Sequence, residues 1–95
     1  GKGVVGHISF SFARDEWAGP HYGLEHIAVL EGYRKLGIGR KLFEVLLRKA
    51  RRERVNITTG TLARNGEALR FYRQLGFRPL SIGLLLDLQN RMPDI

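Results

Sequence analysis

The feature that constrains this chain most is the change of pattern across residues 24–41 (LEHIAVLEGYRKLGIGRK). An apolar run typical of a β-strand leads into a short loop that contains Arg34, Gly37 and Gly39, and helical periodicity begins where this loop ends. Glycines let a backbone approach a ligand closely, and the first turn of a helix offers unpaired N–H groups with a partial positive charge. The pattern therefore predicts a mixed α/β fold whose strand-to-helix turn binds an anionic group such as a pyrophosphate.

The helix expected over residues 39–54 is strongly amphipathic. Its apolar residues are Leu42, Phe43, Leu46, Leu47 and Ala50, which share one face at helical spacing. The opposite face is mostly basic. We therefore expect the apolar face to pack on a sheet and the basic face to meet solvent.

Runs rich in β-branched and aromatic residues predict strands on both sides of this helix. The expected strands cover residues 4–12, 22–30, 55–62 and 77–88, the last as one long strand or as a pair broken near Pro79 or Gly83. A second helix is expected over residues 65–75, with Asn65 as its N-cap and Gly76 as its stop. The order β-β-α-β-α-β predicts the α/β (α+β) class, with a mixed, partly antiparallel sheet flanked by helices.

The length of 95 residues is that of one domain, and no internal repeat or linker divides residues 1–95. The chain contains no cysteine, which excludes disulfides and thiol nucleophiles. No apolar run reaches the roughly 18–20 residues that cross a bilayer. We therefore expect a soluble, cytoplasmic protein without a membrane partner.

The formal net charge of +7 predicts an anionic partner, which could be nucleic acid, an anionic membrane surface or a phosphorylated cofactor. The basic run at residues 48–54 (RKARRER) fits contact with nucleic acid, and it equally fits a solvated helix face. No aromatic residue interleaves with this run to stack on bases. We therefore favour a phosphorylated cofactor and do not expect nucleic acid to be the partner.

Two widespread phosphate-binding loops do not match the glycine-rich turn. A Walker A loop needs Lys and Ser or Thr where Ile38 and Gly39 follow Gly37. The dinucleotide fingerprint needs a third small residue where the chain has Leu42. What remains is the spacing Arg34-x-x-Gly37-x-Gly39 between a strand and a helix.

This spacing resembles the cofactor motif [Q/R]-x-x-G-x-[G/A] of the GNAT family of N-acetyltransferases. A second segment, residues 65–77 (NGEALRFYRQLGF), is similar to the family pattern N-x-x-A-x-x-F-Y-x-x-x-G-F. The two motifs occur in the family's order, and the resemblance extends over about residues 4–88. It implies an acyl-CoA N-acyltransferase-like fold and an acetyl-CoA-dependent N-acetyltransferase.

The resemblance also implies which residues hold acetyl-CoA. The apolar strand segment Ile27, Ala28 and Val29 would contact pantetheine through its backbone. The pyrophosphate would lie on the turn formed by Arg34, Lys35, Leu36, Gly37, Ile38, Gly39 and Arg40. Further cofactor contacts would come from Asn65, Ala68 and Phe71. Asn65 is equally well explained as a helix N-cap, and one side chain cannot easily do both.

By the same resemblance, Tyr72 is the candidate acid that protonates the leaving thiolate. Glu25 is the preferred candidate for the base, and His26 is the alternative because an imidazole is suited to proton transfer near neutral pH. Adjacent residues of a strand face opposite sides, so we expect only one of these two to face the acceptor. His7 and His21 are weaker candidates, and no pattern of His or carboxylates predicts a metal site.

Family members usually carry a further strand and two helices before the segment that matches the start of this chain. Either the chain is short at its N-terminus as a fragment, or another subunit supplies the missing wall. Because an exposed sheet edge invites pairing with a second chain, we expect a homodimer.

The acceptor is expected to be a small-molecule or peptide amine. Asp15, Glu16 and Trp17 fit contact with a cationic acceptor, although a solvated turn is the simpler interpretation. The rival function is a non-catalytic module that binds coenzyme A or nucleic acid.

Overall fold

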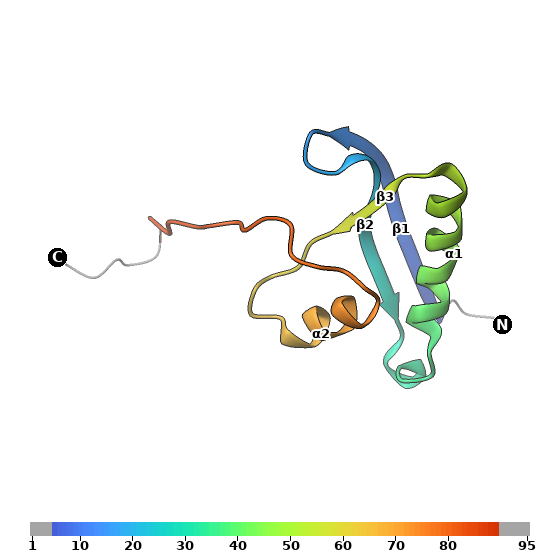
Figure 1. The fold of residues 1–95 in the computed structure, drawn as a ribbon. Helices are drawn as coiled ribbons and strands as arrows, with labels where there is room; N and C mark the ends of the chain where they lie inside the picture. Colours follow the sequence, from blue (N-terminus) through green and yellow to red (C-terminus); the bar gives the residue numbers. More distant parts are fainter. Residues whose placement is uncertain (1–4, 90–95) are drawn as a thin grey trace.

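The computed structural model describes residues 5–89 of the chain, and its strands and helices occur in nearly the predicted order (Figure 1). They are β1 (Gly6–Asp15), β2 (Gly19–Val29), the 3-10 helix η1 (Glu31–Tyr33), α1 (Ile38–Glu53), β3 (Asn56–Thr59) and α2 (Gly66–Gln74). Within the described residues the strands form one sheet of order β1-β2-β3. The β1–β2 pair is antiparallel, and the β2–β3 pair is parallel because α1 carries the chain across between them. The predicted mixed sheet is therefore confirmed.

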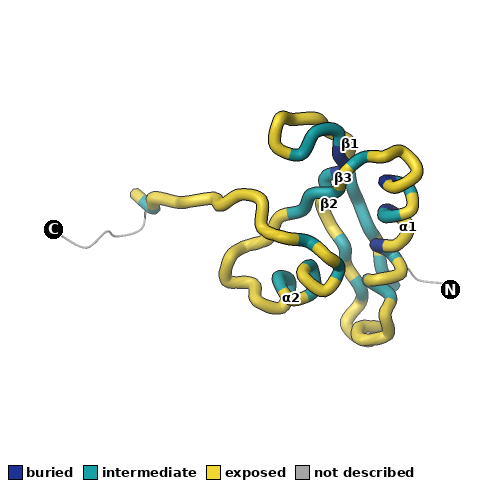
Figure 2. The backbone as a smooth tube through the Cα atoms, viewed as in Figure 1, coloured by how far each residue is buried: buried dark blue, intermediate teal, exposed yellow. Residues whose placement is uncertain are grey.

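The core lies between the sheet and α1. Phe43, Leu46 and Ala50 of α1 are buried against Tyr22 and Leu24 of β2, and Leu46 is fully buried. Figure 2 shows that the darkest, most buried segments lie where α1 meets the strands. The amphipathic face predicted for the helix is the face that packs on the sheet.

A β-bulge interrupts the β1–β2 pair at Glu25. Ser9 pairs with His26 and Phe10 pairs with Leu24, so Glu25 is an extra residue on β2. An extra residue shifts the side-chain alternation of the strand by one position. Leu24 faces the core before the bulge, and Ile27, three residues later, packs on the same core.

Helix α2 begins and ends at the two residues that the sequence predicted as its N-cap and its stop. The Asn65 Oδ1 atom accepts a hydrogen bond from the Ala68 N–H at 3.1 Å and caps α2. Gly76, just beyond α2, has a φ of +104°, a conformation that glycine adopts without steric cost. Helix α1 begins after Gly37, which is also left-handed with a φ of +79°.

The predicted strand or strand pair over residues 77–88 is wrong. Phe77 packs on the core, but the chain that follows has no regular secondary structure up to residue 89 and runs away from the sheet (Figure 1). Its alternating apolar residues are exposed, and Leu84 is 92% exposed. A strand needs a neighbour for its backbone N–H and C=O groups, and the described residues place none beside this segment. No helix within residues 5–89 is long and apolar enough to span a bilayer.

Candidate functional site

The turn between β2 and α1 presents the N-terminus of a helix to solvent. The first N–H that closes the helix is that of Lys41, which donates to the Gly37 carbonyl at 3.1 Å. The N–H groups of Ile38, Gly39 and Arg40 precede it and lie in the first turn, where a helix has no internal acceptor for them. These donors and the positive end of the helix dipole suit a diphosphate.

The two glycines of the motif serve different structural purposes. Gly37 ends the turn in the left-handed conformation and is the N-cap of α1. Gly39 lies beside two other elements, because a Cβ atom there would be in ordinary van der Waals contact at 3.4 Å from Phe71 Cζ and 3.9 Å from Val29 Cγ2. Gly39 therefore joins three parts of the predicted cofactor site: the start of α1, the end of β2 and the helix α2.

The second half of β2 has an open edge. Its pairing with β3 ends at Leu24 and Thr59, where the Thr59 hydroxyl donates to the Leu24 carbonyl at 3.2 Å. The strand then continues to Val29 without β3 beside it. The Leu30 N–H donates toward β1, to the Val5 carbonyl at 2.8 Å. Because N–H groups alternate in direction along a strand, that of Val29 points to the open edge.

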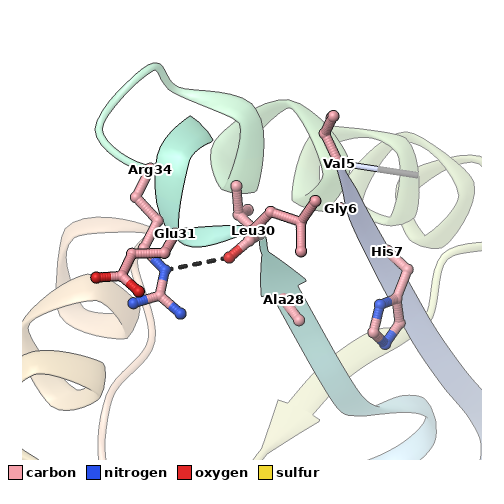
Figure 3. Close-up of a pocket in the computed structure, with 8 residues that line it drawn as sticks. Val5, Gly6, His7, Ala28, Leu30, Glu31 and Arg34 are labelled. Atoms are coloured by element: carbon pink, nitrogen blue, oxygen red, sulfur yellow. Dashed lines mark hydrogen bonds between the residues drawn. The ribbon is translucent and has the colours of Figure 1, made fainter. Parts of the chain in front are cut away.

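Arg34 lies close to this edge but makes a contact that the sequence did not predict. Its Nε atom donates to the Val29 carbonyl at 3.1 Å (Figure 3). The guanidinium also lines a shallow hollow of about 220 Å³ with Glu31, Leu30 and Ala28. This hollow lies on the β1 side of β2 and contains a carboxylate, so it does not suit a diphosphate.

Both candidate bases lie on the sheet face opposite α1. The Ser11 hydroxyl donates to Glu25 Oε2 at 3.2 Å, and His26 pairs with Ser9 and has its ring centroid 6.4 Å from that of His7. Ser9 and Ser11 share the face opposite α1, since Phe10 between them packs on the core. The expectation that only one of Glu25 and His26 can face the acceptor is wrong, because the bulge puts both side chains on one face.

Tyr72 is a half-buried residue of α2. Its ring centroid lies 5.5 Å from that of Phe77 in an edge-on arrangement and 5.6 Å from that of Phe71. Tyr72 and Phe77 both pack against the hydrophobic core. Asn65 uses Oδ1 for the cap of α2, so a contact with pantetheine would need its amide nitrogen.

A polar cluster that the sequence analysis missed joins the strand β2 to the end of α1. The Tyr22 hydroxyl donates to Glu53, and Lys49 Nζ lies 2.9 Å from Glu53 Oε2 and 5.5 Å from the centre of the Tyr22 ring. The hydrogen bond to Glu53 raises the pKa of Tyr22 and that of Lys49, and the bond from Tyr22 lowers the pKa of Glu53. The i,i+4 spacing of Lys49 and Glu53 is a local signal for their ion pair, but no local pattern indicates that Tyr22 joins them.

Solved structures with the same fold are numerous. A protein from Pyrococcus furiosus is 20% identical, with a TM-score of 0.79 over 88% of this chain and 57% of its own. The aminoglycoside N-acetyltransferase AAC(6')-Iy, solved in complex with CoA, is 20% identical, with a TM-score of 0.77 over 90% of this chain and 67% of its own. Naa50 from Arabidopsis thaliana, in complex with a bisubstrate analogue, is 27% identical, with a TM-score of 0.68 over 78% of this chain and 50% of its own.

This chain therefore spans between about half and two thirds of the length of these structures. No protein in a search of curated sequences matches it. The sequence profile of the acetyltransferase (GNAT) family matches residues 1–77, which include both motifs and the complete α1 and α2. The chain belongs to the acetyltransferase (GNAT) family.

Proposed function

We propose that this chain binds acetyl-CoA and takes part in direct transfer of its acetyl group to a primary amine. The observation that carries the proposal is the open edge of β2, which ends at a helix N-terminus with unpaired N–H groups. One linear ligand with a diphosphate and an amide-containing arm would match both features. The CoA and the bisubstrate analogue in the related structures support this choice.

The residues that would hold the cofactor come from three elements. The N–H groups of Ile38, Gly39 and Arg40 would bind the diphosphate, and Arg34 would add positive charge. The backbone of Ile27, Ala28 and Val29 would pair with pantetheine, as a further strand would. The remaining turn residues (Lys35, Leu36 and Gly37) shape the diphosphate site, and Asn65, Ala68 and Phe71 of the α2 segment would border the pantetheine arm.

Bound acetyl-CoA supplies the activated acyl group, and the protein moves the protons. Glu25, directly or through a water molecule, would accept the proton that the amine loses. The N–H of Val29 would polarise the acetyl carbonyl. Tyr72 would donate its hydroxyl proton to the departing thiolate. Because residues 1–95 contain no cysteine, an acetyl-cysteine intermediate on these residues is excluded.

Isothermal titration calorimetry with acetyl-CoA tests the binding step. We expect saturable heat at submillimolar acetyl-CoA, and its absence would contradict the proposal. An assay of thiol release with a panel of amines, small molecules and peptides then tests transfer. Binding without transfer to any amine would favour the rival, a non-catalytic coenzyme A-binding module.

We also propose that the functional protein is a homodimer. The strand β3 has a neighbour on one side only within the described residues, and the apolar residues of the segment 80–88 are exposed. A second copy of the chain would pair with the free edge of β3 and bury the exposed apolar residues of the segment 80–88.

A further inference from the structure

A second hollow lies at the start of β2, at the opposite end of this strand from the turn between β2 and α1. Its volume is about 400 Å³, within the range of small-molecule pockets. Three segments far apart in the sequence surround it: the β1–β2 turn, the end of β3 and the chain after α2. The lining residues are Asp15, Trp17, His21, Thr58, Thr59, Leu80 and Ser81.

Asp15 brings a fixed negative charge to this hollow. Its Oδ1 atom accepts hydrogen bonds from the Trp17 and Ala18 N–H groups at 2.8 and 2.7 Å. The bond from Ala18 lowers the pKa of Asp15, and so does the bond from Trp17, which keeps the carboxylate ionised. The second oxygen, Oδ2, is directed toward His21.

His21 is a buried side chain that lines the hollow, and one of its ring nitrogens is engaged by a backbone carbonyl. It is 5% exposed. Its Nδ1 atom lies 2.7 Å from the Gly19 carbonyl, which can only accept, so Nδ1 carries a proton. In the neutral ring Nε2 is then an acceptor, and it lies 3.9 Å from Asp15 Oδ2, which is too far for a direct hydrogen bond.

The geometry points to an ammonium group as the ligand of this hollow. With a neutral imidazole, Asp15 Oδ2 and His21 Nε2 are two acceptors 3.9 Å apart, and each can accept a hydrogen bond of about 2.8 Å from one ammonium nitrogen between them. Trp17 also lines the hollow, and an indole ring can bind a cation over its π-face. The Thr58 hydroxyl adds a neutral acceptor to the lining.

The hollow lies on the same sheet face as the candidate bases. Tyr22 and Leu24 face the core, so His21 and Gly23 face the opposite side, where Glu25 also lies. The five residues from His21 to Glu25 span about 13 Å of strand, and Gly23 between them has no side chain to obstruct the surface. A Cβ atom there would lie 3.8 Å from Thr58 Oγ1.

We therefore propose that the acceptor is an extended di- or polyamine. One amine would lie near Glu25, and a second ammonium group would bind between Asp15 and His21. This inference rests on the proposed acetyl transfer for the role of Glu25, whereas the ammonium site itself rests only on the geometry of the hollow.

The test uses Trp17, the only tryptophan of the chain, as a fluorescent reporter within the hollow. The full chain is titrated with spermidine and, separately, with n-butylamine, which has a single ammonium group. We expect a saturable change of Trp17 fluorescence with spermidine and a Kd at least tenfold weaker in D15N. The matched control is E16Q, which removes the same charge from the same turn but does not line the hollow.

No saturable change up to 10 mM spermidine would overturn the proposal, and so would equal weakening in D15N and E16Q. Asp15 also caps its turn, so circular dichroism must show that D15N folds. If D15N does not fold, ¹H–¹⁵N spectra of the unchanged protein, recorded with and without spermidine, test the site instead. Spermidine must shift the Trp17 indole and the amides of Thr58 and Thr59, and unshifted signals would overturn the site.

The outcomes separate this site from the proposed function. Acetyl-CoA binding is measured independently by calorimetry. Spermidine binding without acetyl-CoA binding would keep the ammonium site and reject the transfer reaction. Acetyl-CoA binding without spermidine binding would reject the ammonium site and leave the proposed transfer reaction standing. Acetyl transfer to n-butylamine as readily as to spermidine would reject the extended di- or polyamine as the acceptor.

Discussion

The Ser11 hydroxyl donates to Glu25 Oε2 at 3.2 Å across the β1–β2 pair, at the bulge that interrupts their register. The contact holds the carboxylate on the sheet face opposite α1. His26 follows on the same face, so the candidate bases are neighbours there and experiments must separate them.

Substitutions at Glu25 and His26 should affect acetyl transfer unequally. We expect Glu25→Gln to lower kcat by about 10²-fold, because general base catalysis typically contributes that much or more. Acetyl-CoA affinity measured by calorimetry should stay unchanged. His26→Gln should change kcat less than threefold. The reverse order of effects would assign the base to His26.

Tyr72→Phe should lower turnover and leave acetyl-CoA affinity nearly intact. The hydroxyl is the only group removed, and the ring contacts with Phe71 and Phe77 remain. We expect kcat to fall by about 10²-fold if the phenol protonates the thiolate. Tyr33→Phe, at an exposed tyrosine of η1, is the control. An unchanged kcat in Tyr72→Phe would remove Tyr72 from the mechanism.

Gly37→Ala should weaken acetyl-CoA binding more than Gly32→Ala does. An alanine at position 37 must adopt a φ of +79°, which costs about 1–2 kcal/mol, and relief of this strain would displace the N–H groups of the turn. Gly32 lies in the same loop, and a Cβ atom there would meet no atom within 4 Å. Calorimetry of both variants checks the prediction, and equal affinities would argue against the turn as the diphosphate site.

The cluster of Tyr22, Lys49 and Glu53 should make stability depend on pH at both ends of the range. The lowered pKa of Glu53 contributes stability above its ordinary value of 4.5 that is lost as the pH falls through the folded-state pKa. The raised pKa of Tyr22 contributes stability below its ordinary value of 10.0 that is lost as the pH rises. Thermal unfolding from pH 3 to 11 should show a plateau of Tm between these limits.

Glu53→Gln should flatten that profile, since the charged partner of both other groups is lost. Tm near pH 7 should fall by a few degrees relative to the unchanged chain. Glu44→Gln, at an exposed position of the same helix, is the matched control. A profile of Glu53→Gln that parallels the unchanged chain would show that the cluster does not contribute to stability.

The exposed leucines of residues 80–88 should control the association of two chains. Sedimentation velocity is expected to show a dimer at micromolar concentrations. The double substitution Leu84→Lys and Leu86→Lys should yield monomers, because each charge opposes burial of the apolar segment. Val45→Lys, at a half-exposed apolar position on α1, should leave the dimer intact. A monomeric unchanged chain would reject the homodimer.

Local sequence patterns were enough to predict the elements whose partners lie close in the chain. The apolar face of α1, the cap at Asn65 and the stop at Gly76 were all predicted, because each depends on residues within one or two helical turns. The order of elements and the two motifs were enough to predict the family, and the match of the GNAT family over residues 1–77 confirms this prediction.

Tertiary structure alone decided the features that depend on contacts between distant residues. The alternating leucines after Pro79 favoured a strand, but a strand also needs a partner edge, and a local pattern contains no information about one. The bulge at Glu25 depends on the register with β1, and it alone placed Glu25 and His26 on one face. The hollow around His21 is lined by three segments that lie far apart in the sequence. Only the folded chain brings their side chains together, so no local pattern could predict it.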